Sequence, residues 1–356
     1  NITRTNDITN SLRTNAPDNV WIIGQDLFLQ VQFNTPIFVN NDNGSPTLNF
    51  TINGVSKTAT YLSGGDGQTT LIFRYTVVEG DDSNGADIGV GTFNLNNSVI
   101  EDARETQAQV TITQTTVLQT VIDGVRPTIS AVQAPADGTY SQVASLTALN
   151  FPVQFSEPVV LAATNASDLP ITIGATTRNA RATSTLSSGG GNRLLTFRYT
   201  IVNSDNDSDG IAIASPITNA ANVRDNAGNT AVDLTYTAPP LTNVLVDTTV
   251  PTILSVVEPA AATYVSGQTL TFTVNFSEPV TYTGTPRIRL DIGGTIVNAN
   301  VTTPALPATT SLTFSYTPIA TNLMDNAISF VALEAATRSA IQDIGRNNIG
   351  NVNLPA

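Results

Sequence analysis

The sequence contains no cysteine and no histidine, and these two absences exclude many kinds of protein chemistry. Without histidine the chain has no Ser-His-Asp triad, no histidine general base and no zinc site with an imidazole ligand. Without cysteine it has no thiol nucleophile, no iron–sulfur cluster and no disulfide. Few enzyme classes remain, so the composition predicts a protein that is not an enzyme.

Positive charge is also scarce. The chain has 15 basic and 28 acidic residues, a net charge of −13, and Lys57 is its single lysine. Nucleic-acid-binding proteins concentrate basic residues against phosphates, so the sequence argues against a nucleic-acid partner. No run of about 18 apolar residues is present, so direct membrane insertion is not expected.

The 356 residues contain an internal repeat. Three segments recur three times in the same order, and their anchors Phe33, Phe155 and Phe276 are 122 and 121 residues apart. A period of this length is that of a whole domain rather than of a solenoid unit. The segments are LFLQVQFNTPI (27–37), LNFPVQFSEPV (149–159) and LTFTVNFSEPV (270–280), then LIFRYT (71–76), LTFRYT (195–200) and LTFSYT (312–317), then IEDARET (100–106), VRDNAGNT (223–230) and IQDIGRNN (341–348).

Each junction between repeats has an aspartate a few residues before a proline, in VIDGVRPTI (121–129) and VLVDTTVPTI (244–253). Proline fixes φ and has no N–H to donate, so it interrupts regular strand pairing. Boundaries are therefore expected near Asp123 and Asp247. They define a first domain of residues 1–123 with an N-terminal arm (1–12), a second domain of residues 124–247, and a third of residues 248–356 whose last strand is expected to be incomplete.

Each repeat is predicted to be β. In the second repeat Leu195, Phe197 and Tyr199 alternate with polar residues, a period of two that buries one face of a strand. Glycine-rich turns such as 63–68 and 187–192 separate such segments. About seven short strands per repeat are typical of an immunoglobulin-like sandwich. The predicted fold class is all-β, with three tandem immunoglobulin-like β-sandwich domains in an extended row, because the linkers are short.

The succession VxFSEPV, LTFxYT, DNAGN and VDTTVPT resembles the tandem bacterial immunoglobulin-like and cadherin-like repeats of large secreted adhesins and surface proteins. DNAGNTA (225–231) and VDTTVPTI (246–253) are its most characteristic parts, and the first repeat departs from it with FNTPI and EDARET. The resemblance covers nearly the whole chain. It implies an extracellular or cell-surface, non-catalytic role as a spacer, adhesin or fibre, and it identifies no ligand.

An immunoglobulin-like strand order predicts that acidic residues of neighbouring domains meet at each junction. Glu157 and Asp225 would face the linker residue Asp123, and Glu278 and Asp343 would face Asp247. Repulsion among carboxylates favours a hard cation with flexible oxygen coordination, so Ca²⁺ is the expected occupant of these interdomain sites. The preceding domain is expected to add Asp81 and Asp82 at the first junction, and Asp205, Asp207 and Asp209 at the second.

Two other interpretations of these acids stay open. Loops rich in Asp, Asn and Gly are often plain solvated turns, because their side chains bond their own backbone. A carboxylate pair of the glycosidase kind is disfavoured, because a residue that recurs in each domain is more typical of structure than of one active site. The loop DNDSDG (205–210) begins like an EF-hand, but Pro216 stands where that motif needs Glu.

The two ends of the chain suggest a mode of assembly. The second repeat has 22 residues from Asp225 to Asp247, whereas the third has 13 from Asp343 to Ala356. We expect the arm, which contains Ile2, to form a strand that completes the third domain of the next copy, giving a head-to-tail filament by donor-strand exchange. The alternatives are a third domain that ends early and a fragment of a longer array.

The sequence therefore predicts a non-catalytic extracellular structural or adhesive protein, either a stiff stalk or a filament subunit. The expected partners are copies of itself, neighbouring repeats and a host or surface ligand, and calcium is the expected cofactor. The alternative is a ligand- or carbohydrate-binding β-sandwich module. Such a module needs exposed aromatic residues, whereas only 6% of residues are aromatic and most lie on inward stripes.

Overall fold

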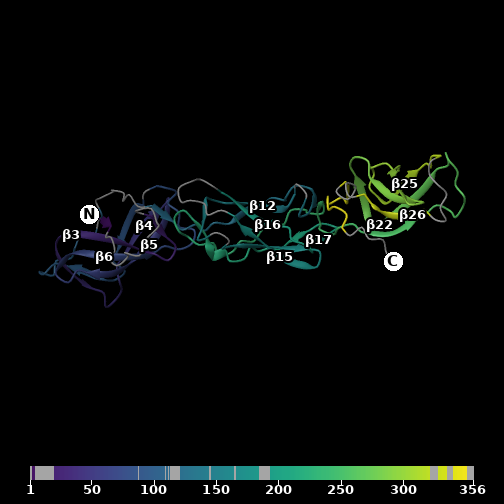
Figure 1. Ribbon diagram of the computed structural model, residues 1–356. Helices are drawn as coiled ribbons and strands as arrows, with labels where there is room; N and C mark the ends of the chain where they lie inside the picture. The colour runs from purple at the N-terminus through teal and green to yellow at the C-terminus, as the bar shows by residue number, and fades with distance from the viewer. Residues whose placement is uncertain are drawn as a thin grey trace.

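A computed structural model describes residues 2–4, 20–86, 88–108, 110, 112, 121–143, 146–163, 166–183, 193–320, 328–334 and 340–350. These residues form β-strands and loops, with one short 3-10 turn, η1 (Ala220–Asn222). The strands build three sandwiches in an extended row (Figure 1). The prediction of an all-β chain of tandem immunoglobulin-like β-sandwiches is confirmed. In the described part of the chain, no helix has the length and apolar character needed to cross a membrane.

Each sandwich has its own hydrophobic core. The buried apolar residues form three clusters, within residues 21–122, 132–246 and 253–349. Asp123 and Asp247 lie between consecutive clusters. The cores therefore supply the stability of the individual sandwiches, and the orientation of one sandwich on the next depends on the contacts at the two junctions.

The first sandwich contains β1 (Ile2–Arg4), β2 (Val20–Ile22), β3 (Asp26–Asn40), β4 (Thr47–Ile52), β5 (Val55–Gly64), β6 (Gln68–Thr76), β7 (Gly89–Asn94), β8 (Val99–Glu101) and β9 (Val121–Asp123). Its main sheet has the order β1-β3-β6-β5-β4-β7, β8 pairs with β3, and β2 runs parallel to β9. Residues 2–4 of the arm therefore lie in their own sheet, where Ile2 is opposite Val31. These three residues therefore pair within their own chain rather than with the next copy, whereas the rest of the arm (1 and 5–12) is outside the described residues.

The second sandwich contains β10 (Ile129–Val132), β11 (Gly138–Tyr140), β12 (Ala148–Phe155), β13 (Val159–Leu161), β14 (Asp168–Ile173), β15 (Thr176–Ala182), β16 (Leu194–Thr200), β17 (Asn206–Asp207), β18 (Ala212–Ile213), β19 (Val223–Asp225) and β20 (Val244–Asp247). Its main sheet has the order β10-β12-β16-β15-β14-β18, and a second sheet has the order β11-β20-β17. As in the first sandwich, the last strand runs parallel to the strand near the domain's start. This pairing brings the aspartate at the end of β20 to the junction.

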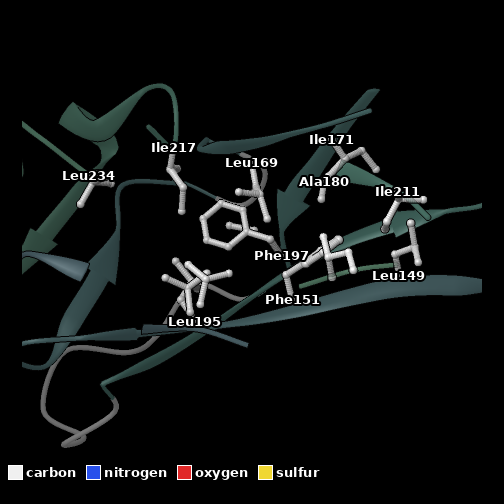
Figure 2. Packing of buried hydrophobic residues seen from close by; sticks show 14 of the residues in the cluster. Leu149, Phe151, Leu169, Ile171, Ala180, Leu195, Phe197, Ile211, Ile217 and Leu234 are labelled. Carbon is white, nitrogen blue, oxygen red and sulfur yellow. The ribbon is translucent and has the colours of Figure 1, made fainter. Parts of the chain in front are cut away.

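The alternation of apolar residues predicted for the second repeat fills this core (Figure 2). Phe151 of β12 lies opposite Phe197 of β16, both are fully buried, and Leu169 of β14 packs in the same cluster. Burying a side chain of this size contributes about 1.5–3 kcal/mol to folding. The aromatic stripe is therefore an internal structural element.

The third sandwich contains β21 (Ile253–Val257), β22 (Leu270–Tyr282), β23 (Arg287–Ile292), β24 (Thr295–Val301), β25 (Thr309–Tyr316), β26 (Ile328–Leu333) and β27 (Ile341–Gln342). Its main sheet has the order β21-β22-β25-β24-β23-β26, and β27 pairs with β22. Tyr264 donates its hydroxyl to the carbonyl of Ala260, as Tyr140 does to Ala136, so residues 262–264 occupy the position of β11. Among the described residues, no strand pairs with 262–264.

Candidate metal centres at the domain junctions

The first junction brings together three carboxylates from two sandwiches. Asp123 ends β9, the last strand of the first sandwich, whereas Glu157 and Asp225 belong to the second. One oxygen of each lies within 4.8 Å of the others. We call these residues the first triad.

The second junction repeats the arrangement. Asp247 ends β20, and Glu278 and Asp343 come from the third sandwich, again with one oxygen of each within 4.8 Å of the others. The segment 340–350, yellow in Figure 1, lies at this junction against the second sandwich. We call these residues the second triad. The structure thus brings together six of the predicted acids in two equivalent groups.

The glutamate of each triad is positioned by the serine before it. The backbone N–H of Ser156 donates to the carbonyl of Thr128 at 2.9 Å, and its hydroxyl accepts from the Thr128 N–H at 3.1 Å. Ser277 makes the same two bonds with Thr252, both at 2.9 Å. Because each serine ties the strand end to the linker, the following glutamate is held at the junction. This explains the recurring Ser-Glu pair in the sequence.

The aspartate from the hairpin of the first triad is held by Asn229. Asp225 Oδ1 accepts from the Asn229 N–H at 2.8 Å, and Oδ2 accepts from the Asn229 side-chain amide at 2.7 Å. That amide also donates to the Asp123 carbonyl at 2.8 Å, and its oxygen accepts from the Ile23 N–H at 3.1 Å. Asn229 therefore connects the two sandwiches as well as orienting a carboxylate.

Asn347 performs the same role at the second junction. Its side-chain amide donates to Asp343 Oδ2 and to the Asp247 carbonyl, each at 2.9 Å. The Ser141 hydroxyl adds a further bond between sandwiches, to the carbonyl of Gly345 at 2.7 Å. No role was predicted for these asparagines, although they recur in the sequence at the end of DNAGN and DIGRN.

Each triad contains one oxygen that has no protein partner. The Oε1 atoms of Glu157 and Glu278 are buried and accept no hydrogen bond. Burial raises the pKa of Glu157 to about 7, and the neighbouring carboxylates of Asp225 and Asp123 add to the shift. Burial likewise raises the pKa of Glu278 to about 7, with contributions from Asp247 and Asp343. A buried, unpartnered carboxylate oxygen among other carboxylates is the environment that a cation stabilises.

The remaining acids of the two triads are affected in the same direction. Burial, followed by the charge of Asp225, raises the pKa of Asp123 to about 6. Burial also raises the pKa of Asp225, Asp247 and Asp343, although Asn229 and Asn347 oppose the shift of the carboxylates to which they donate. Negative charge is therefore costly in both triads as long as no cation balances it.

The other five predicted acids do not belong to the triads, although one of them, Asp82, pairs with a triad residue. Asp81 and Asp205 are buried in their own sandwiches. Each accepts a tyrosine hydroxyl, at 2.6 Å and 2.7 Å, and each pairs with a basic side chain. These contacts are Tyr75 and Lys57 for Asp81, and Tyr199 and Arg178 for Asp205.

The last three predicted acids lie in the same two loops. Asp207 accepts from the backbone N–H groups of Gly174 and Gly210, at 2.6 Å and 2.8 Å, so its carboxylate shapes a turn. Asp209 is exposed. Asp82 is the exception: it forms a β-bridge with Asp123, and its charge helps to raise the pKa of Asp123.

In the presence of a chelator, the free energy of unfolding is expected to fall as the pH rises towards 7. The two triad glutamates have a pKa of about 7 in the folded chain against an ordinary value of 4.5. Between these two pKa values the folded chain holds protons that the unfolded chain releases. The stabilisation from protonated glutamates is therefore fully present below the unfolded-state pKa of 4.5, and it is lost as the pH rises through the folded-state pKa of about 7. Thermal unfolding in EDTA at about pH 5 and about pH 8 measures the effect.

The double variant Glu157→Gln/Glu278→Gln isolates this contribution, because glutamine resembles the protonated side chain. The variant should show a smaller loss of melting temperature between the two pH values than the native chain. Glu258→Gln, which changes an exposed glutamate, should leave the native pH dependence intact. Equal pH dependence in the native chain and the double variant would contradict the electrostatic assignment.

Comparison with known proteins returns structural similarity alone. No family model matches the chain, and no curated protein matches it. A crystal structure of the I9–I11 tandem of titin is 8% identical with a TM-score of 0.25, over 92% of this chain and 97% of that one. A marsupial T cell receptor is 11% identical with a TM-score of 0.26, over 94% of this chain and 97% of that one. Similarity at this level assigns no function.

Proposed function

We propose that this chain is a non-catalytic, extracellular or cell-surface structural protein, a stiff stalk of the kind that carries adhesins. Ca²⁺ ions bound between its sandwiches hold them in line. The observation that carries the proposal is the pair of carboxylate triads, each with a buried and unpartnered glutamate oxygen. The same arrangement of carboxylates occurs at both junctions, so it is a feature of the repeat rather than of one interface.

The donor set fits a hard cation. Ca²⁺ takes six to eight oxygen ligands at flexible angles, and carboxylates, backbone carbonyls and water complete such shells. Each triad offers three carboxylate oxygens and no nitrogen or sulfur ligand. Within the described residues, neither triad forms an ion pair with a lysine or arginine. Arg193 acts on Glu157 without forming such a pair, and a cation would supply the remaining positive charge.

A cation at either site would act between sandwiches. One ligand of each triad ends the last strand of the preceding sandwich, and two come from the next. Consecutive domains in one chain otherwise tend to move relative to each other. Binding across the junction restricts that motion, and occupancy at about 100 times the dissociation constant stabilises the bound arrangement by about 2.7 kcal/mol. Calcium binding at both junctions would therefore give a rod whose stiffness depends on calcium.

The aromatic residues support a structural role over the alternative of a ligand-binding module. Phe73, Phe151, Phe197, Phe272 and Phe314 are all fully buried in the three cores. Carbohydrate-binding surfaces use exposed aromatic rings, and these stripe residues face inward. The adhesive contact with a host or surface ligand would therefore be made by other parts of the surface.

Small-angle X-ray scattering with and without EDTA tests the proposed rod. The chain should have its largest dimension and narrowest distribution in calcium, and chelation should shorten and broaden it because the junctions bend. Glu157→Gln/Glu278→Gln should behave in calcium as the native chain behaves in EDTA. Glu258→Gln serves as the matched control and should remain calcium-responsive. A native chain with the same scattering in both buffers would refute calcium-dependent stiffening.

A head-to-tail filament is a second candidate, which one feature of the third sandwich favours. Ala262 and Thr263 are exposed and, among the described residues, pair with no strand, whereas the equivalent segments of the other sandwiches pair with a last strand. An open strand edge is a template for another chain. The arm of a second copy would fill this edge by β-augmentation, and β1 would have to leave β3 to do so.

Deletion of residues 1–7 tests this mode of assembly. Electron microscopy of the concentrated native chain should show fibres, and the deletion should abolish them because the donor strand is gone. Val232→Asp, at a residue that is 67% exposed on the second sandwich, should retain fibres and controls for surface charge. Fibres that persist without residues 1–7, or their absence from the native chain, would contradict donor-strand exchange.

A further inference from the structure

The two triads are equivalent, but the residues beside them are not. Asp82 lies opposite Asp123 in an antiparallel bridge, and Asn206 lies opposite Asp247 at the same register. The first junction therefore has a fourth carboxylate where the second has a neutral amide. This difference affects charge without changing the backbone arrangement.

The side chains at this position also differ in what they bond. Asn206 Oδ1 accepts from the Thr248 N–H at 2.8 Å and from the Thr249 hydroxyl at 3.1 Å, so its oxygen is committed to the linker. Asp82 Oδ1 accepts from the Asn84 N–H at 2.7 Å, and its charge acts on both Asp123 and Glu157. The fourth carboxylate thus increases the negative potential at the first triad.

A second difference concerns the residue that follows the hairpin aspartate. Asn226 follows Asp225, and its side-chain oxygen is buried without a hydrogen-bond partner. Ile344 follows Asp343 at the second junction and is 64% exposed. Next to its hairpin aspartate the first junction therefore has a buried amide oxygen, a type of atom that Ca²⁺ binds, whereas the second has an exposed aliphatic side chain.

We propose that the first junction binds Ca²⁺ more tightly than the second, so that the second loses its ion first as calcium falls and becomes the hinge of the rod. This inference rests on the calcium sites proposed above. Calcium affinity rises with the negative charge of the site, and Asp82 adds charge near the first triad that the second triad lacks. The chain would then soften in two steps as calcium falls rather than in one.

The two junctions also differ in the contacts that do not involve a cation. Arg126 in the first linker donates to the Thr230 carbonyl of the second sandwich at 2.5 Å and lies 3.5 Å from the carboxylate of Glu79 in the first. Val250, 45% exposed, occupies the equivalent position before the proline of the second linker. The first junction therefore keeps this cross-link after calcium leaves, whereas the second keeps the hydrogen bond from Ser141 to Gly345.

The single tryptophan provides a probe of the first site. Trp21 of β2 lies opposite Ile122 of β9, and the next pair along these strands is Ile22 with Asp123. A terbium ion at the first triad should therefore be sensitised by selective excitation of Trp21. Calorimetric titration with calcium counts both sites, and displacement of terbium luminescence by calcium reports the first one alone.

The native chain should show two classes of calcium site whose affinities differ by about tenfold or more, which corresponds to about 1.4 kcal/mol. Terbium luminescence should follow the tighter class. Asp82→Asn should weaken the tighter class, and the reciprocal variant Asn206→Asp should strengthen the weaker one. The new carboxylate still accepts from Thr248 and Thr249, so the fold is preserved.

Two calcium sites of equal affinity, or terbium luminescence that follows the weaker class, would contradict the proposed difference in affinity while leaving the calcium sites in place. An unchanged native pattern in both reciprocal variants would also overturn it. Absence of calcium binding by calorimetry, with the native fold confirmed by circular dichroism, would overturn the sites themselves and with them the proposed function.

Discussion

The negative charge gathered at the contacts between sandwiches is the feature on which the proposed function depends. The three cores are closed separately, and their apolar clusters contain none of the triad carboxylates. Three carboxylates within 4.8 Å repel one another, and partial burial strengthens that repulsion. Protons or a cation relieve this repulsion. Under the proposed function the alignment of the rod is therefore coupled to its ionic surroundings, and the raised pKa values of the triad glutamates make the free energy of unfolding depend on pH as well.

The repeat uses the same short motifs for folding and for this coupling. The hairpin aspartates Asp225 and Asp343 accept backbone N–H groups that close their turns, so they are needed even in an isolated sandwich. The asparagines four residues later then tie those turns to the preceding sandwich. The glutamates alone contribute a buried oxygen with no structural partner. A buried acceptor oxygen that the fold leaves without a partner supports the proposed cation.

Much of this arrangement was predictable from the sequence, because the repeat displays it three times. The period, the β alternation and the convergence of Glu157, Asp225 and Asp123 follow from motif spacing and strand direction. The roles of Asp81 and Asp82 did not, because adjacent residues in an extended segment point in opposite directions and only the register decides which one turns inward.

Two other features depended on long-range contacts that a linear pattern does not contain. Asn229 reaches Ile23 across the junction, some two hundred positions earlier in the chain. The arm that contains Ile2 was predicted to pair with another copy, because no sequence motif indicates a partner for it within the chain. Its short strand β1 pairs with β3 instead. Edge strands of three residues carry too little alternation to be assigned a partner from sequence.

The central claim is that a cation occupies each triad, and anomalous diffraction from crystals of the full chain soaked in terbium tests it most directly. The account predicts one strong peak among Asp123, Glu157 and Asp225 and another among Asp247, Glu278 and Asp343, each at a coordination distance of about 2.3–2.6 Å from carboxylate oxygens. Peaks confined to exposed loops, with both triads lacking density, would contradict the account.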